Sequence, residues 1–162
     1  MTIKAIFFAS RLHAESLLGS VNTAVISIKD PGTADARLSA DFKYVLRMAF
    51  YDAMPADEFL PAPMPGLFDY RMAREITDFV ATLQSAREDI TIMVHCEYGV
   101  SRSAAVALFI EAYTAVPLTA RDFAYDANPW VVDRMLLEND HLQIDIPIRN
   151  PSLERRTEQR AA

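Results

Sequence analysis

The sequence predicts an α/β fold, with a single domain and a central, mostly parallel, twisted sheet of about four to five strands flanked by helices. Two observations lead to this prediction. Apolar runs of β-favouring residues alternate along the chain with segments that have helical spacing or turn residues. The chain of 162 residues also matches one ordinary domain, and a hydrophobic content of 51% is sufficient for one sizeable core.

Four apolar segments are expected to form the strands of this sheet. They cover residues 3–9, 23–28, 44–50 and 90–95. The last segment is apolar on both faces, which is typical of a central strand covered by helices on either side. We therefore expect this strand to be buried in the middle of the sheet.

Helical spacing is clearest over residues 67–86, where charged side chains form one stripe and apolar side chains form another. The apolar stripe consists of Met72, Ile76, Phe79, Val80 and Leu83. This pattern predicts an amphipathic surface helix. Residues 103–113 are instead apolar nearly all round, which predicts a helix buried in the interior.

Two shorter helices are expected after the buried one. The first begins near Thr119 and the second covers residues 130–139, with a break at Asn128 and Pro129 between them. Trp130 opens the second helix. We expect this side chain to seal the core rather than to line a site.

A proline-rich segment over residues 54–66 separates the third predicted strand from the first long helix. Its four prolines exclude a central strand or a helix interior, and they are Pro55, Pro61, Pro63 and Pro65. Either a plain connector or a functional loop fits this composition, and both interpretations stay open. We predict one domain over residues 1–150 and a polar C-terminal tail over residues 151–162.

The acidic balance of the chain limits its expected partners. A formal net charge of -6 repels nucleic acid phosphates and anionic lipids, so we expect neither nucleic acid nor a membrane as a partner. No apolar stretch approaches the roughly 18 residues that a membrane span needs. The single cysteine cannot form an internal disulfide, which favours a reducing, cytoplasmic location.

The most informative feature is the junction between the last predicted strand and the buried helix. The strand ends in His95 and Cys96, five residues follow, and Arg102 and Ser103 open the helix. The N–H groups of such a loop can form an anion-binding nest, and a helix N-terminus adds unpaired donors and a partial positive charge. We predict a phosphate-binding loop formed by Glu97, Tyr98, Gly99, Val100, Ser101 and Arg102.

Four residues of this junction have distinct predicted roles. The loop N–H groups, the helix terminus and the charge of Arg102 favour the thiolate of Cys96, which makes it a nucleophile. The planar fork of Arg102 is suited to bind two phosphate oxygens at the loop mouth. The Ser103 hydroxyl can donate to the sulfur, and Gly99 can adopt the positive φ that a tight loop needs.

The pattern His95-Cys96-x-x-Gly99-x-x-Arg102-Ser103 resembles the signature of the protein tyrosine and dual-specificity phosphatases at every defining position. The chain length resembles the compact dual-specificity-like members, bacterial ones included. The coarse resemblance covers roughly residues 21–140, and only the loop is specific. It implies a phosphocysteine intermediate on Cys96, no metal, no cofactor, and a His95 that supports the loop without transferring protons.

The resemblance also implies an aspartate that acts first as a general acid and then as a general base. In the family this residue lies on a loop between an upstream strand and the helix that precedes the cysteine strand. We predict Asp52, which follows the apolar run at 44–50. Asp57, inside the proline-rich segment, is the reserve candidate.

Three functions are compatible with the motif. The leading hypothesis is a phosphomonoesterase, a protein-tyrosine or dual-specificity phosphatase that acts on a phosphorylated protein or a small phosphomonoester. By the same resemblance, Glu97 and the absence of lysine from the loop disfavour phosphoinositide and RNA substrates. The alternative is a catalytically weak or inactive module that binds phosphorylated partners. A redox or sulfur-transfer role for Cys96 is the third, and it leaves Arg102 and Ser103 unexplained.

Overall fold

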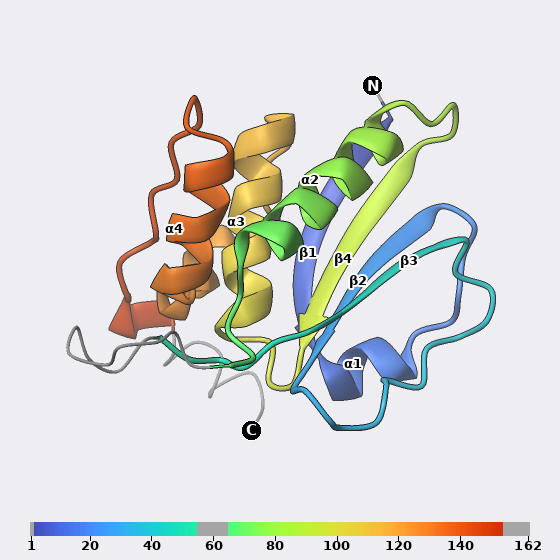
Figure 1. The fold of residues 1–162 in the computed structure, drawn as a ribbon. Coiled ribbons are helices and arrows are strands. Elements are labelled where there is room, and N and C mark those ends of the chain that lie inside the picture. The colour runs from blue at the N-terminus through green and yellow to red at the C-terminus, as the bar shows by residue number, and fades with distance from the viewer. Residues whose placement is uncertain (1, 55–64, 154–162) are drawn as a thin grey trace.

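A four-stranded, all-parallel sheet lies at the centre of the computed structural model, which describes residues 2–54 and 65–153 (Figure 1). The strands lie in the order β1-β4-β2-β3. The elements in chain order are β1 (Ile3–Ser10), α1 (Arg11–Ser16), β2 (Thr23–Lys29), β3 (Tyr44–Ala49), α2 (Tyr70–Gln84), β4 (Ile90–Cys96), α3 (Arg102–Thr114), the 3₁₀ helix η1 (Arg121–Asp126) and α4 (Pro129–Glu138). The predicted α/β class and the parallel sheet are confirmed.

The strands follow the apolar runs of the sequence closely. Strands β1, β2 and β4 end at Ser10, Lys29 and Cys96, one residue later than predicted, and β3 ends at Ala49, one residue earlier. The predicted central position of the last strand is also confirmed. Strand β4 pairs with β1 on one side and with β2 on the other, so its backbone is buried in the sheet.

The predicted bounds of the first long helix, residues 67–86, need a correction at both ends, since α2 covers Tyr70–Gln84. Helix α2 begins at Tyr70 rather than at residue 67, because the Asp69 side chain caps it and accepts hydrogen bonds from the N–H groups of Arg71 and Met72, both at 3.0 Å. The buried side chains of the helix are Ala73, Ile76, Val80 and Leu83. They lie along the predicted apolar stripe.

The C-terminal helices were predicted in part. Helix α3 is buried from its first turn, as expected. The segment expected to form a helix from Thr119 instead contains the 3₁₀ helix η1, which begins at Arg121. The break at Asn128 and Pro129 is confirmed, since Asn128 caps α4 and Pro129 is its first residue. Within the described ranges, every helix is too short or too polar to cross a membrane.

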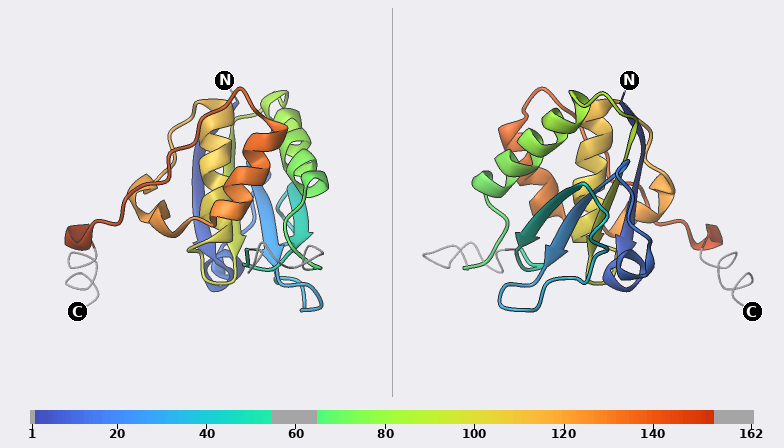
Figure 2. Two further views of the ribbon diagram at one scale, coloured as in Figure 1. Left: turned by 60° about the vertical axis from the view of Figure 1, so that its left-hand side comes forward. Right: turned by 90° about the vertical axis from the view of Figure 1, so that its right-hand side faces the viewer.

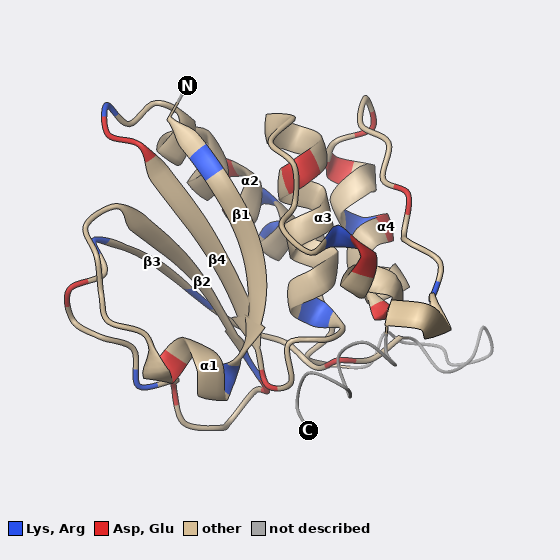
Figure 3. Ribbon diagram, turned by 180° about the vertical axis from the view of Figure 1, so that it is seen from behind, with Lys and Arg blue, Asp and Glu red and all other residues tan. Residues whose placement is uncertain are grey.

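The two faces of the sheet are covered differently. Helices α2 and α3 pack on one face, and α4 packs against both of them on the outside (Figure 2). On the other face, Ala14 of α1 and Phe42 of the segment after β2 cover Val25 and Met93. We expected helices on both sides of the central strand. Figure 3 shows that this second face instead carries only the short helix α1 and irregular chain.

The parallel arrangement brings the carboxyl ends of all strands to one edge of the sheet. Ser10 pairs with Cys96 at the ends of β1 and β4, and Lys29 pairs with Ala49 at the ends of β2 and β3. Residues that directly follow different strands therefore lie near one another although they are far apart in the sequence. Ligands of parallel α/β sheets bind at this edge.

Candidate active site

The thiol of Cys96 lies at the carboxyl end of β4 and is almost fully buried, with 3% of the residue exposed. Residues 97–101 connect it to α3. The first turn of α3 folds back on the thiol, so that the hydroxyl oxygen of Ser103 lies 3.1 Å from the Cys96 sulfur. The predicted Cys96 and Ser103 pair is therefore in hydrogen-bond contact. A hydroxyl donor at this distance stabilises negative charge on sulfur.

The loop is tight because it packs against the backbone at the end of β1. Gly99 has φ +70°, and a Cβ atom there would lie 2.5 Å from the carbonyl carbon of Ala9. Only glycine fits this position without a shift of the backbone. The N–H group of Arg11 also donates to the carbonyl of Glu97 at 3.1 Å. The start of α1, which the sequence did not predict, thus holds the loop in place.

The backbone donors of the loop are open. Among the described residues, no acceptor binds the N–H groups from Glu97 to Ser103. Ser101 occupies the N-cap position of α3 but makes no capping hydrogen bond, and its φ of -114° and ψ of -71° differ from the extended conformation usual for a cap. Consecutive unpaired N–H groups at a helix N-terminus are the donors that bind an anion.

His95 supports the loop from below. Its Nε2 lies 2.6 Å from the hydroxyl of Ser27, and its Nδ1 lies 3.3 Å from the carbonyl oxygen of Cys96. Burial lowers the pKa of His95 below its ordinary value, and the hydrogen bond with the Cys96 carbonyl opposes this only in part. A neutral imidazole satisfies both contacts, with Nδ1–H donating to the carbonyl and Nε2 accepting from Ser27.

Arg102 is buried, with 4% of the residue exposed, although its charge normally favours solvent. Its Nη1 donates to the Asp30 carboxylate and to the carbonyl of Phe50, both at 2.7 Å. Its Nε is buried and has no hydrogen-bond partner among the described residues. One side of the guanidinium is therefore fixed by the protein, whereas the Nε side retains an unsatisfied donor. Leaving a buried donor unsatisfied costs about 1–3 kcal/mol, which a ligand would recover.

Asp52 reaches the loop from the chain after β3. Its Oδ1 accepts hydrogen bonds from the Ser101 hydroxyl at 2.7 Å and from the Asn128 side-chain amide at 2.8 Å. The carboxylate therefore contacts the N-cap residues of both α3 and α4. Asp57, the reserve candidate, lies outside the described residues.

An open cavity of about 390 Å³, which we call the edge cavity, lies beside these groups. It is lined by Asp30, Tyr51, Asp52, Ala53, Tyr98 and Arg102. The cavity thus combines the predicted arginine and the predicted acid with the loop. The side chain of Tyr98 is exposed at its mouth, with 81% of the residue accessible. Any contact of Glu97, Tyr98 and Val100 with an anion in the loop would come from their backbone, because their side chains face solvent.

The structure adds three residues that the sequence did not identify as parts of the site. They are Ser27 beside His95, Asp30 beside Arg102 and Asn128 beside Asp52. The sequence did contain a signal for Asp30. This residue directly follows the end of β2, and the carboxyl ends of parallel strands meet at one edge of the sheet. Asn128 was identified only as a helix break.

The arrangement combines a buried thiol, a hydroxyl in hydrogen-bond contact with its sulfur, open backbone donors, a cation with a free donor and a carboxylate. Such a set can bind a tetrahedral oxyanion and attack it with sulfur. Within residues 2–54 and 65–153, no group of three or more His, Cys, Asp or Glu side chains is placed to hold a metal ion. No protein-family model matches the chain, and no curated protein matches it significantly.

Proposed function

We propose that this chain is a cysteine-dependent phosphomonoesterase of the protein-tyrosine or dual-specificity type. The observation that carries the proposal is the open N-terminus of α3. Directly after the Cys96 thiol, the N–H groups from Glu97 to Ser103 have no acceptor within residues 2–54 and 65–153. The buried Nε of Arg102 is a further donor without an acceptor in the same part of the chain. A phosphoryl group offers the oxygens that these donors lack.

In the first step, the Cys96 thiolate attacks phosphorus and forms the P–S bond while the bond from phosphorus to the leaving oxygen breaks. Asp52, in its protonated form, gives its proton to that oxygen. The loop N–H groups and the free side of Arg102 bind the equatorial oxygens, where charge redistributes during transfer. The product of this step is a phosphocysteine and a free alcohol or phenol.

In the second step, water attacks the phosphocysteine, the P–S bond breaks and inorganic phosphate leaves. Asp52, now a carboxylate, takes the proton from the attacking water. Ser103 donates a hydrogen bond to the departing sulfur, which its distance of 3.1 Å from that sulfur allows. The two steps return the enzyme to its starting state without a cofactor.

Asp30 and Asp52 both line the edge cavity, and their contacts favour different roles. Asp30 pairs with the fixed side of Arg102 at 2.7 Å, so proton transfer from it would break an ion pair. Asp52 contacts neutral donors from Ser101 and Asn128. We therefore assign the general acid to Asp52 and the orientation of Arg102 to Asp30.

A generic aryl phosphate tests the proposal. We expect the full chain to hydrolyse it without added metal, and we expect vanadate, a phosphate analogue with similarly placed acceptor oxygens, to block the reaction competitively. Binding of vanadate or a phosphotyrosine peptide without turnover would favour the inactive binding module instead. If the chain shows no turnover and no binding, both hypotheses are refuted.

A further inference from the structure

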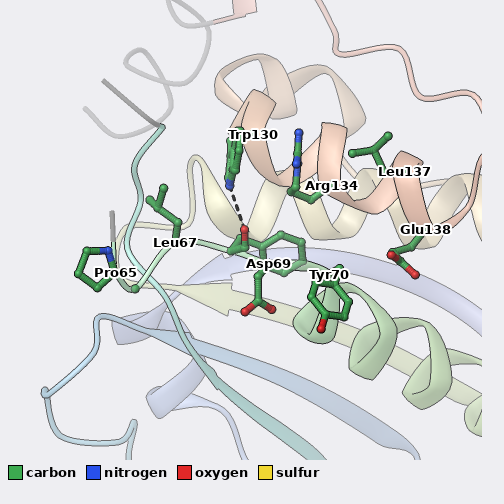
Figure 4. Close-up of a pocket in the computed structure, with 10 residues that line it drawn as sticks. Pro65, Leu67, Asp69, Tyr70, Trp130, Arg134, Leu137 and Glu138 are labelled. Carbon is green, nitrogen blue, oxygen red and sulfur yellow. Dashed lines mark hydrogen bonds between the residues drawn. The ribbon is translucent and has the colours of Figure 1, made fainter. Parts of the chain in front are cut away.

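A second pocket, which we call the α4 pocket, lies between α4 and the segment that leads into α2 (Figure 4). It has a volume of about 380 Å³, a size that holds one or two side chains. Trp130, Arg134 and Leu137 line it from α4, and their spacing places them on one face of the helix. Leu67 and Tyr70 line the opposite wall. We expected Trp130 to seal the core, and it packs against the core while also forming a wall of this pocket.

The α4 pocket contains one cation that has no carboxylate partner among the described residues. Of its two acidic side chains, Asp69 caps α2 and Glu138 pairs with Arg74 at 3.1 Å. No described carboxylate pairs with Arg134, and its Nε is buried without a hydrogen bond to any described residue. Its guanidinium lies over the Trp130 ring, 4.0 Å from the ring centroid.

A stacked guanidinium keeps its edge free for hydrogen bonds. The Trp130 ring orients the plane of Arg134 and shields one of its faces, so that a ligand does not have to order a mobile side chain. The free donors match a carboxylate, and the ring together with Leu137 offers apolar contact beside it. The pocket therefore fits an acidic group attached to an apolar chain. The cation is local, because the net charge of -6 on the whole chain repels acidic ligands at long range.

The α4 pocket adjoins the candidate active site. The N–H of Tyr51, which lines the edge cavity, donates to the carbonyl of Gly66, which lines the α4 pocket, at 2.8 Å. Asn128 forms a second connection. Its amide nitrogen binds Asp52, and its amide oxygen caps α4 by accepting from the N–H of Trp130 at 2.9 Å. The linings of the two pockets are therefore connected by direct hydrogen bonds.

We propose that the α4 pocket is a specificity site for protein substrates, in which Arg134 pairs with an acidic side chain that flanks the phosphorylated residue. Trp130 and Leu137 contact the apolar part of the same segment. This inference rests on the proposed phosphatase function and narrows its substrate class to phosphorylated proteins with an acidic residue at a fixed distance from the phosphate.

The test uses the full chain and a series of short phosphotyrosine peptides. All flanking residues are alanine, and one glutamate is moved through each position in turn. We expect glutamate at one position, or at two adjacent ones, to raise kcat/KM about tenfold over the all-alanine peptide, as for a charge-assisted pair. Each rate is divided by the same variant's rate on an aryl phosphate, which separates peptide recognition from chemistry.

Two variants of Arg134 and one control complete the experiment. Arg134→Gln should abolish the rise in kcat/KM that a peptide glutamate produces. With Arg134→Glu, an arginine at the same peptide position should produce the rise instead. Arg87→Gln removes the same charge from an exposed position beyond the far end of α2 and should leave the gain intact. A reversal of preference by Arg134→Glu also shows that this variant is folded.

Several outcomes would overturn the inference. One is a gain below twofold at every position, and another is a gain that survives Arg134→Gln. A dimer in sedimentation experiments that Arg134→Glu dissociates would show that a second copy of the chain covers the pocket. Hydrolysis of the aryl phosphate without any peptide preference would leave the proposed function standing and remove only this inference. No hydrolysis of any phosphate would remove both.

Discussion

The N-termini of α3 and α4 lie side by side at the same edge of the sheet and are built in opposite ways. At α4, the Asn128 oxygen accepts hydrogen bonds from the N–H groups of Trp130 and Val131, which is an ordinary cap. At α3, Ser101 occupies the same position and caps nothing. Both N-cap side chains donate to one oxygen of Asp52. Asp52 therefore engages the hydroxyl that could otherwise have capped α3.

The difference between the two helices distinguishes an N-terminus that stabilises the fold from one that is open to a ligand. A cap contributes about 1 kcal/mol, and α2 and α4 both have one from an Asp or Asn side chain. Helix α3 lacks this stabilising contribution, and its first backbone N–H groups have no described acceptor beside Cys96. We infer that its N-terminus is kept for a ligand, whereas the N-terminus of α4 serves to position Asp52.

The largest effect expected from breaking this arrangement is that of Asp52→Asn. An acid that protonates the leaving oxygen matters most for a poor leaving group, so we expect a loss in kcat of about hundredfold on phosphotyrosine. The loss on an aryl phosphate with an acidic phenol should be much smaller. Steady-state kinetics on the two substrates measures the difference.

Asp30→Asn and Asp57→Asn are the controls for this assignment. Neither should show a loss that depends on the leaving group, because Asp30 orients Arg102 and Asp57 is only the reserve candidate. If either variant shows that dependence while Asp52→Asn stays near wild type, the general acid is assigned to the wrong residue.

Arg102→Lys is expected to have the next largest effect. Lysine can keep the ion pair with Asp30 but lacks the second, free donor of the guanidinium, so kcat/KM should fall at least about tenfold. Arg121→Lys is a matched control, because Arg121 pairs with Glu111 away from the edge cavity. Equal activity of Arg102→Lys and wild type would show that geometry at this position does not matter.

The capping difference itself can be measured as stability. Asp69→Ala removes a cap and should lower the free energy of unfolding by about 1 kcal/mol, whereas Ser101→Ala should cost less than half as much. Ser101→Ala should nevertheless reduce kcat, because it removes a hydrogen bond to Asp52. Urea unfolding and kinetics on the same samples test both statements. Equal destabilisation by the two variants would contradict an open N-terminus of α3.

The smallest expected effect comes from His95, the titratable support of the loop. Because burial lowers its pKa in the folded protein, the unfolded chain takes up a proton first as the pH falls below about 6.5. The free energy of unfolding should therefore decrease as the pH falls below about 6.5, by at most about 1.4 kcal/mol per pH unit for one proton. His95→Asn should flatten this part of the profile, and an unchanged slope would contradict a neutral, buried His95.

The parts of the molecule that the sequence predicted well are those encoded locally. Each strand is one apolar run, so its ends could be placed within a residue. The candidate loop lies in nine consecutive residues, and the contact between Cys96 and Ser103 follows from the first turn of α3. Helix α1 has only six residues, too few for helical periodicity to appear, and it was missed.

The parts that the sequence did not predict depend on contacts between distant segments. Arg102 and Asp30 are 72 positions apart, and Asn128 and Asp52 are 76 apart. Their proximity follows from the strand order β1-β4-β2-β3, which no local pattern specifies. The predicted role of Arg102 was also incomplete for this reason, because the pattern indicated a fork over the loop mouth and could not show that Nη1 is held by the protein.

The most direct test of covalent catalysis by Cys96 is to trap the phosphocysteine intermediate. The full chain is mixed with an aryl phosphate and quenched, and mass spectrometry locates the phosphoryl group. We expect one phosphoryl group on Cys96. Cys96→Ser should form none, still bind vanadate and retain less than about a hundredth of kcat, a loss of at least roughly 3 kcal/mol in transition-state stabilisation. A phosphoryl group on another residue, or a Cys96→Ser variant that keeps more activity than this, would contradict covalent catalysis by Cys96.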